Sequence, residues 1–140
     1  MPAKNSRKKQ LLSWIRSAEA RIGIVGMGYV GLPLAMAFTE KGFPVLGFDV
    51  DQSKVKALGK GQSYIAHLDA GRVRALARSG KLRATSDFAR LREPDIVVVC
   101  VPTPLTPQRE PDTSFIEKTG EQIRDRLRTG QLVILESTTY

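Results

Sequence analysis

The feature that most constrains the fold of this chain is a cluster of glycines placed directly after a short aliphatic run. Residues 22–25 read Ile-Gly-Ile-Val, and residues 26–31 read Gly-Met-Gly-Tyr-Val-Gly. Apolar residues then recur every fourth position, as on one face of a helix, at Val30, Leu34 and Phe38. This order predicts a strand, a tight turn and a helix, which begin a β–α–β unit with a parallel sheet.

The glycine cluster has the spacing G-x-G-x-x-G, in which each glycine has a separate physical role. Gly26 permits the tight turn, Gly28 lets the main chain approach a ligand where a Cβ would collide, and Gly31 allows close packing of helix on strand. The free N–H groups at the start of the helix, together with the positive end of its dipole, attract an anion. In this context the motif predicts that the turn binds the diphosphate of a dinucleotide.

An acidic residue at the end of the next aliphatic run supports this prediction. Asp49 follows residues 45–48 and stands about 20 residues after Gly28, the spacing expected of the acid that binds the adenosine ribose. A carboxylate there accepts hydrogen bonds from ribose hydroxyls and repels a 2′-phosphate, so we expect NAD rather than NADP. Lys54 leaves an alternative open, because a cation close by is able to approach a 2′-phosphate; a solvated helix residue is the simpler interpretation.

Short aliphatic runs and helical stretches alternate along the rest of the chain. Further strands are expected at residues 45–48, 82–85, 96–101 and 132–135, with helices after the capping residues Asp51, Asp69 and Ser114. Ser114 and Glu117 form a predicted capping box for a helix that Gly130 ends. The run at 96–101 is uninterrupted and aliphatic, which is typical of a strand covered on both faces, so we place it at the centre of the sheet.

The alternation predicts an α/β fold of the Rossmann type, which is a doubly wound parallel sheet with helices on both faces. Such a domain normally adds a sixth strand, whereas this chain ends at Tyr140 soon after the fifth, so we expect it to be truncated there. Prolines keep residues 102–111 out of both helix and sheet. That stretch is expected to form a loop at the carboxyl end of a strand, where ligands bind in this fold.

Composition and charge narrow the classes of protein that remain. The 140 residues suffice for one domain, and a single cysteine excludes an internal disulfide. The net charge is +8, but residues 1–21 hold six Lys or Arg and only one acidic residue. We therefore expect a basic helical leader at residues 1–20, solvated or docked on a partner rather than bound to nucleic acid, and an NAD-binding domain at residues 21–140. No apolar run is long enough to cross a bilayer, so we expect no membrane contact and a cytoplasmic location.

Three stretches resemble the UDP-glucose/GDP-mannose dehydrogenase family. They are Gly28-Tyr29-Val30-Gly31-Leu32-Pro33, Val101-Pro102-Thr103-Pro104 and Glu136-Ser137-Thr138-Thr139. Within the family the chain is most similar to the UDP-N-acetylglucosamine 6-dehydrogenases, through Leu11-Leu12, Ser63-Tyr64-Ile65 with His67, and Arg109-Glu110-Pro111-Asp112. UDP-glucose dehydrogenases carry a lysine where this chain has Glu136, which argues against UDP-glucose as substrate.

The resemblance implies that the C6 alcohol of a UDP-N-acetylhexosamine is oxidised to a carboxylate while two NAD are reduced. Together with the glycine motif, it assigns cofactor binding to Gly26, Met27, Gly28, Tyr29, Val30, Gly31, Asp49, Lys54, Val101, Thr103, Pro104 and Thr138. Thr138 also receives a catalytic role, positioning a water or polar network; a hydroxyl bonded to the main chain is the alternative. The family's nucleophilic cysteine, its basic lysine and most of its sugar contacts would follow Tyr140. This chain is therefore expected to bind NAD without turning over a UDP-sugar alone, and any homodimer is expected of the full-length protein.

Two side chains receive no chemical role. Cys100 lies in an aliphatic strand, where burial raises the pKa of a thiol, so we assign it to the core. His67 is the only histidine and has no metal-ligand partners close in sequence, so no metal site is expected. Two functional alternatives stay open, namely another Rossmann oxidoreductase of the 3-hydroxyacid type and a nonenzymatic nucleotide-binding module.

Overall fold

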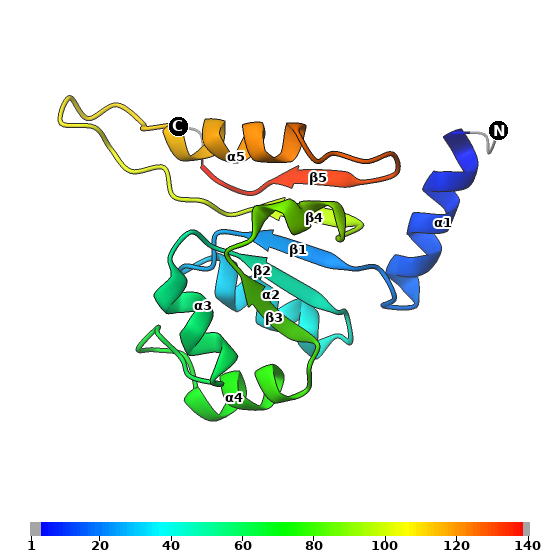
Figure 1. Ribbon diagram of the computed structural model, residues 1–140, viewed down its shortest axis with the longest axis horizontal. Helices are drawn as coiled ribbons and strands as arrows, with labels where there is room; N and C mark the ends of the chain where they lie inside the picture. Colours follow the sequence, from blue (N-terminus) through cyan, green and yellow to red (C-terminus); the bar gives the residue numbers. More distant parts are fainter. Residues whose placement is uncertain (1–3, 139–140) are drawn as a thin grey trace.

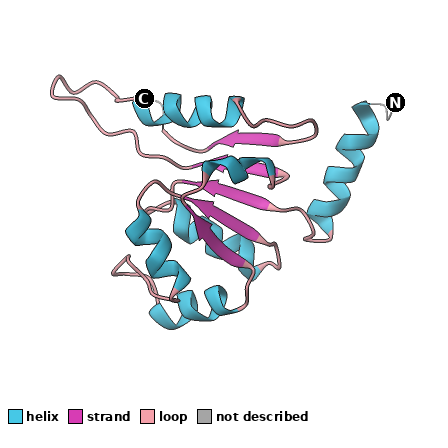
Figure 2. Ribbon diagram, in the orientation of Figure 1, coloured by secondary structure: helices cyan, strands magenta, loops and turns pink. Residues whose placement is uncertain are grey.

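A five-stranded parallel sheet forms the middle of the computed structural model, which describes residues 4–138 (Figures 1 and 2). The strands lie in the order β3-β2-β1-β4-β5. Their bounds are β1 (Ile22–Val25), β2 (Val45–Phe48), β3 (Leu82–Thr85), β4 (Ile96–Val99) and β5 (Leu132–Leu135). The chain winds outward from β1 to β3 and then returns to the other side of β1 for β4 and β5. This reversal of direction confirms the predicted doubly wound Rossmann-type sheet.

The helices cover both faces of this sheet, as predicted. They are α1 (Lys4–Arg16), α2 (Gly31–Glu40), α3 (Gln52–Gly59), α4 (Ala70–Arg78), the 3₁₀ helix η1 (Phe88–Arg92) and α5 (Ser114–Arg124). Alternate strand residues point to opposite faces, so Ile22, Ile24 and Val98 pack in one cluster with residues of α2, α3 and α4. Val97 and Val99 pack on the other face, with residues of η1 and α5. Figure 1 shows η1 in front of the sheet and α2 behind it.

The strand predicted at residues 96–101 is an interior strand, but it is shorter than predicted and is not the middle one. All four residues of β4 are buried, which confirms that both of its faces are covered. The middle position belongs to β1, which has two strands on each side in the order β3-β2-β1-β4-β5, and β4 lies between β1 and β5. The strand ends at Val99, although the Cys100 N–H still donates to the Val25 carbonyl at 2.7 Å. The prolines that follow prevent the ladder from continuing.

Strand β5 forms an edge of the sheet and differs from β4 in its burial. Its four residues are aliphatic like those of β4, yet their side chains are between 39% and 49% exposed. No further strand pairs with β5 within residues 4–138. Helix α5 contributes Ile123 to the cluster on its face of the sheet, together with Leu91 of η1.

The helix caps were predicted correctly for two helices and wrongly for a third. The carboxylates of Asp51 and Asp69 accept N–H groups in the first turns of α3 and α4. At α5 the capping residue is Thr113 rather than Ser114, and the Thr113 hydroxyl donates to the Glu117 carboxylate at 2.8 Å. The helix also stops at Arg124, with Asp125 as its C-cap, well before Gly130, which has a φ of +91° and lies in the turn that leads into β5.

Helix α1 stands at the end of the sheet where the strands begin, as Figure 1 shows. It is joined to the domain by Leu11, Trp14 and Ile15, which pack against the cluster on the α2 face. The Trp14 carbonyl also accepts the N–H groups of Glu19 and Ala20, at 2.8 and 3.1 Å. The first three residues of the predicted leader lie outside the described residues. No helix within the described part of the chain is long and apolar enough to span a membrane.

Candidate functional site

The turn between β1 and α2 has a shape that only glycine permits at two positions. Gly26 has a φ of +93°, and a Cβ at this residue would lie 2.7 Å from the Cys100 carbonyl oxygen. A Cβ at Gly31 would overlap the carbonyl oxygen of Gly26. These two positions therefore hold the turn against the neighbouring strand and the start of α2, in the roles that the glycine spacing predicts.

The same turn presents main-chain N–H groups that have no partner. Within residues 4–138, the amides of Gly28, Tyr29 and Val30 donate to no acceptor, and the cap position Val30 has no side-chain hydrogen bond. A Cβ at Gly28 would meet no atom within 4 Å, so the space beside this residue is open. Unpaired amides at a helix N-terminus bind anionic oxygens without any basic side chain. The turn is therefore suited to a diphosphate.

Asp49 lies directly against this turn, at the end of β2. Its carboxylate accepts the Met27 N–H through Oδ2 at 2.9 Å and the Asp51 N–H through Oδ1 at 2.9 Å. The residue is only 9% exposed, and Lys54 Nζ lies 4.0 Å from Oδ2. Each carboxylate oxygen can accept a second hydrogen bond, so Asp49 retains capacity for ligand hydroxyls.

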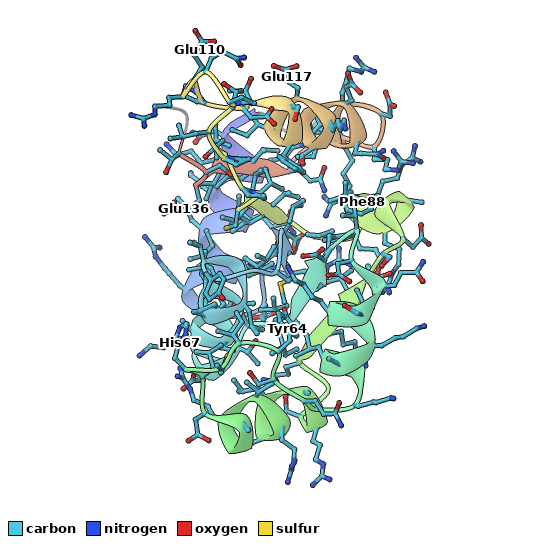
Figure 3. All side chains as sticks on the ribbon, turned by 90° about the vertical axis from the view of Figure 1, so that its left-hand side faces the viewer. Tyr64, His67, Phe88, Glu110, Glu117 and Glu136 are labelled. Atoms are coloured by element: carbon cyan, nitrogen blue, oxygen red, sulfur yellow. The ribbon has the colours of Figure 1, made fainter. Side chains whose placement is uncertain are left out.

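The loop between α3 and α4 also contacts the turn, through Tyr64 and His67. The Tyr64 hydroxyl donates to the Met27 carbonyl at 2.5 Å. The ring of His67 stacks on the ring of Tyr29, with centroids 5.9 Å apart and planes 7° apart. Lys54 Nζ lies 5.9 Å from the centre of the Tyr64 ring. Figure 3, viewed toward the carboxyl ends of the strands, shows Tyr64 and His67 on this loop.

Burial accounts for the protonation state of Tyr64. Burial raises the pKa of the Tyr64 phenol far above its usual range, and the nearby carboxylates of Asp49 and Asp51 raise it further. The hydroxyl is therefore protonated near neutral pH, which is the form that donates to the Met27 carbonyl.

A cleft of about 830 Å³ opens at the carboxyl ends of the strands, beside the turn. It is lined by Gly26, Gly28, Tyr29, Val30, Asp49, Lys54, Val101, Thr103 and Thr138, all of which the sequence predicts as site residues. Three other predicted residues lie outside its lining. The Met27 side chain is buried in the core, Gly31 is buried where α2 begins, and the Pro104 carbonyl bonds the Asp112 N–H at 2.7 Å within the loop after β4.

The cleft also has walls that the sequence analysis did not anticipate. One wall is a face of α5 that presents Phe115, Lys118, Thr119 and Gln122. These residues recur at the spacing of one helix face, and this spacing is the sequence signal that groups them. Phe88 of η1 and Glu136 after β5 also line the cleft, and Figure 3 labels both.

Cys100 lies at the margin of the core rather than within it, because β4 ends at Val99 and the residue only packs against the buried cluster on the α2 face. The side chain is partly buried at the back of the cleft, and burial raises the pKa of its thiol to about 11, with a further contribution from Glu136. The thiol is therefore protonated and unreactive near neutral pH. Within residues 4–138, no three His, Cys, Asp or Glu side chains are arranged to hold a metal ion.

Comparison with known proteins agrees with this geometry. The model of the UDP-glucose/GDP-mannose dehydrogenase family, NAD binding domain, matches residues 20–140. The chain is 37% identical over 121 residues to the UDP-N-acetyl-D-mannosamine dehydrogenase of Escherichia coli (strain K12), an overlap of 86% of this chain and 28% of that protein. It is 35% identical over 122 residues to the UDP-N-acetyl-D-glucosamine 6-dehydrogenase of Pseudomonas aeruginosa, an overlap of 87% and 28%.

A solved structure shows the same arrangement. The NDP-N-acetyl-D-galactosaminuronic acid dehydrogenase from Methanosarcina mazei Go1 superposes with a TM-score of 0.82 at 31% identity, over 94% of this chain and 30% of that one. The chain thus spans little more than a quarter of the length of these relatives. The matches over residues 20–140 show that the chain belongs to the UDP-glucose/GDP-mannose dehydrogenase family, in which this region is the NAD-binding domain.

Proposed function

We propose that the turn between β1 and α2 is where the chain binds NAD, with the diphosphate on the amides of Gly28, Tyr29 and Val30. The observation that carries this proposal is the set of three unpaired N–H groups beside an open space at Gly28. Gly26 and Gly31 keep the turn in this shape, and Met27 joins it to Asp49. No cationic side chain is needed, because the amides and the helix dipole attract the anion.

The adenosine ribose is assigned to Asp49, whose carboxylate lines the cleft beside the turn. A 2′-phosphate at this position would meet a buried carboxylate, which favours NAD over NADP. Lys54 does not reverse this preference, because its ammonium group already lies 4.0 Å from the Asp49 carboxylate and 5.9 Å from the centre of the Tyr64 ring. We assign Lys54 to the rim of the ribose site, as the partner of Asp49.

The nicotinamide end of the cofactor is assigned to the opposite part of the cleft. Val101 and Thr103 line it from the loop after β4, and Thr138 lines it from the end of β5. Pro104 follows them and fixes the course of the loop. When bound here, NAD⁺ would supply the acceptor for a hydride from the carbon that is oxidised. Thr138 has an exposed side chain in the cleft and is assigned a catalytic role in positioning water or a polar group of the substrate.

The substrate proposed for the full-length protein is a UDP-N-acetylhexosamine. Two of the relatives named above are dehydrogenases of UDP-N-acetyl-D-mannosamine and UDP-N-acetyl-D-glucosamine. Oxidation of a C6 alcohol to a carboxylate removes two hydrides, so one substrate and one water react with two NAD⁺ to give two NADH and three protons. The part of the chain described here supplies the cofactor site, and we propose that it does not turn over a UDP-sugar alone.

Two measurements test these assignments separately. Calorimetric titration of the chain with NADH and NADPH is expected to show saturable binding of NADH and binding of NADPH at least about tenfold weaker, which corresponds to about 1.4 kcal/mol. A folded chain that binds neither dinucleotide would overturn the cofactor proposal. The full-length protein is expected to reduce NAD⁺ with UDP-N-acetylglucosamine or UDP-N-acetylmannosamine. Faster turnover of UDP-glucose or of a 3-hydroxyacid would overturn the substrate proposal.

A further inference from the structure

We infer that Tyr64, in the loop between α3 and α4, is a positioning residue for the dinucleotide-binding turn. Its hydroxyl is bonded to the Met27 carbonyl at 2.5 Å and so fixes the peptide group that joins Met27 to Gly28. The inference rests on the proposed NAD site, and it assigns to the turn a residue that lies far from the glycine motif in sequence.

The planarity of the peptide group links Tyr64 to the ligand. In a trans peptide the C=O of one residue and the N–H of the next lie in one plane and point in opposite directions. The Tyr64 hydroxyl holds the Met27 C=O, so it directs the Gly28 N–H to the opposite side of the turn. Gly28 has no side chain to restrain this peptide, and glycine rotates more freely than any other residue. A hydrogen bond from outside the turn therefore limits the orientations of an amide that we assign to the diphosphate.

Both polar groups of Met27 are held, each by a different part of the chain. The Met27 N–H donates to Asp49 at 2.9 Å, and the Met27 C=O accepts from Tyr64. Asp49 restrains the peptide before Met27, and Tyr64 restrains the peptide after it. The carboxylate and the phenol therefore act on successive peptide groups of the same turn, and neither can replace the other.

The loop that carries Tyr64 is itself anchored to the domain. Ile65 is 5% exposed and belongs to the core cluster on the α2 face. The Ser63 hydroxyl accepts the Ile65 N–H at 3.2 Å and donates to the Ile65 carbonyl at 3.0 Å. His67 stacks on Tyr29, so the loop contacts the turn at a second point. These contacts give Tyr64 a fixed position from which to hold the turn.

The test compares Tyr64→Phe with a control that loses an equivalent hydrogen bond elsewhere. Thr39→Val removes a buried hydroxyl that donates to the Ala35 carbonyl at 2.8 Å inside α2, and it leaves the turn unchanged. Both variants lose one hydroxyl-to-carbonyl bond, so their melting temperatures should fall by similar amounts. Only Tyr64→Phe is expected to weaken NADH binding, by roughly fivefold, which is the typical worth of one hydrogen bond. The ¹³C shift of the Met27 carbonyl in the ligand-free protein should also change in Tyr64→Phe alone.

The possible outcomes separate this inference from the proposed function. Wild-type protein that does not bind NADH would contradict the proposed function, whatever the Met27 carbonyl shift does. If the wild type binds and Tyr64→Phe binds equally well, or no more weakly than Thr39→Val, the positioning role of Tyr64 is wrong. A Tyr64→Phe chain that does not fold would also overturn it, because the hydroxyl would then serve the fold rather than the turn.

Discussion

The carboxylate of Asp49 and the main-chain amide of Met27 share a hydrogen bond of 2.9 Å, although the two residues follow different strands. This bond joins the end of β2 to the turn after β1. The acid that we assign to the adenosine ribose therefore also shapes the turn that we assign to the diphosphate. A change at Asp49 is expected to affect both parts of the cofactor site together.

Asp49→Asn is expected to weaken NADH binding by at least about tenfold, or about 1.4 kcal/mol. An amide has only one acceptor oxygen, so its NH₂ group must face either the Met27 N–H or the Asp51 N–H, which both donate to Asp49. The loss of the negative charge should also reduce the difference between the affinities for NADH and NADPH. Titration of the variant with both dinucleotides measures the two effects. An unchanged NADH affinity would show that Asp49 does not act on the ligand.

Alanine at two glycines of the turn is expected to impair different properties, namely NADH binding at Gly28 and stability at Gly31. Gly28→Ala places its Cβ in open space, so the variant should fold normally and yet bind NADH at least about tenfold more weakly, because the ligand needs that space. Gly31→Ala places its Cβ on the Gly26 carbonyl oxygen, so it should lose more than about 3 kcal/mol of unfolding free energy.

Gly59→Ala serves as the matched control for both alanine variants. Its Cβ would meet no atom within 4 Å at the end of α3, and a helical alanine changes stability by at most about 1 kcal/mol. Urea unfolding and NADH titration of the three variants provide the comparison. Equal stability of Gly28→Ala and Gly31→Ala would contradict the geometry of the turn.

The buried carboxylate of Asp95 should make stability depend on pH at the acidic end. Burial raises the pKa of Asp95, but the Arg21 N–H at 2.8 Å, the Arg128 guanidinium at 2.9 Å and the positive charge of Arg21 together lower it by more, so its net pKa is below the usual value. A depressed pKa in the folded state stabilises the protein above the unfolded pKa of about 3.9. This contribution is lost as the pH falls through the folded pKa.

Asp95→Asn tests this effect, with Asp125→Asn as its control. At pH 7 the Asp95 variant should be less stable than wild type by about 1–3 kcal/mol, and the difference should shrink between pH 5 and pH 2. Asp125 is exposed and, among residues 4–138, its carboxylate pairs only with the neighbouring Arg124, so its variant should match wild type throughout. Urea unfolding at several pH values measures these differences. If the difference in unfolding free energy between wild type and Asp95→Asn does not change with pH, the charge of Asp95 does not have this role.

The fold could be predicted from the sequence because its signals are local and repeat along the chain. Strands β4 and β5 are short aliphatic runs, β1 and β2 are largely apolar, and Asp51 and Asp69 stand at helix starts where their carboxylates accept main-chain N–H groups. The predictions were less accurate where several residues compete for one role. Thr113 and Ser114 are both residue types that cap helices, yet neither caps α5 through its side chain, and the Asp112 carboxylate accepts the Ser114 N–H at 2.9 Å instead.

The candidate site could be predicted only in part, because some of its contacts join distant residues. The glycine motif and Asp49 have a defined spacing, and the structure places them together. The bond between Tyr64 and Met27 spans 37 positions, and it depends on how the loop after α3 folds back onto the turn. The cleft wall of Phe115 and Lys118 depends in the same way on how α5 lies over the sheet. The spacing of Phe115 and Lys118 indicates a helix face, but no local pattern shows what that face or the Tyr64 hydroxyl contacts.

The central claim is that the amides of Gly28, Tyr29 and Val30 hold the diphosphate of NAD. An NMR titration of the ¹⁵N-labelled chain, first with NADH and then with ADP and adenosine, tests it most directly. The three amide resonances are expected to shift together and to saturate with NADH and with ADP, while adenosine, which has no phosphate, should leave them in place. Saturable NADH binding that leaves these three resonances unmoved would contradict the claim.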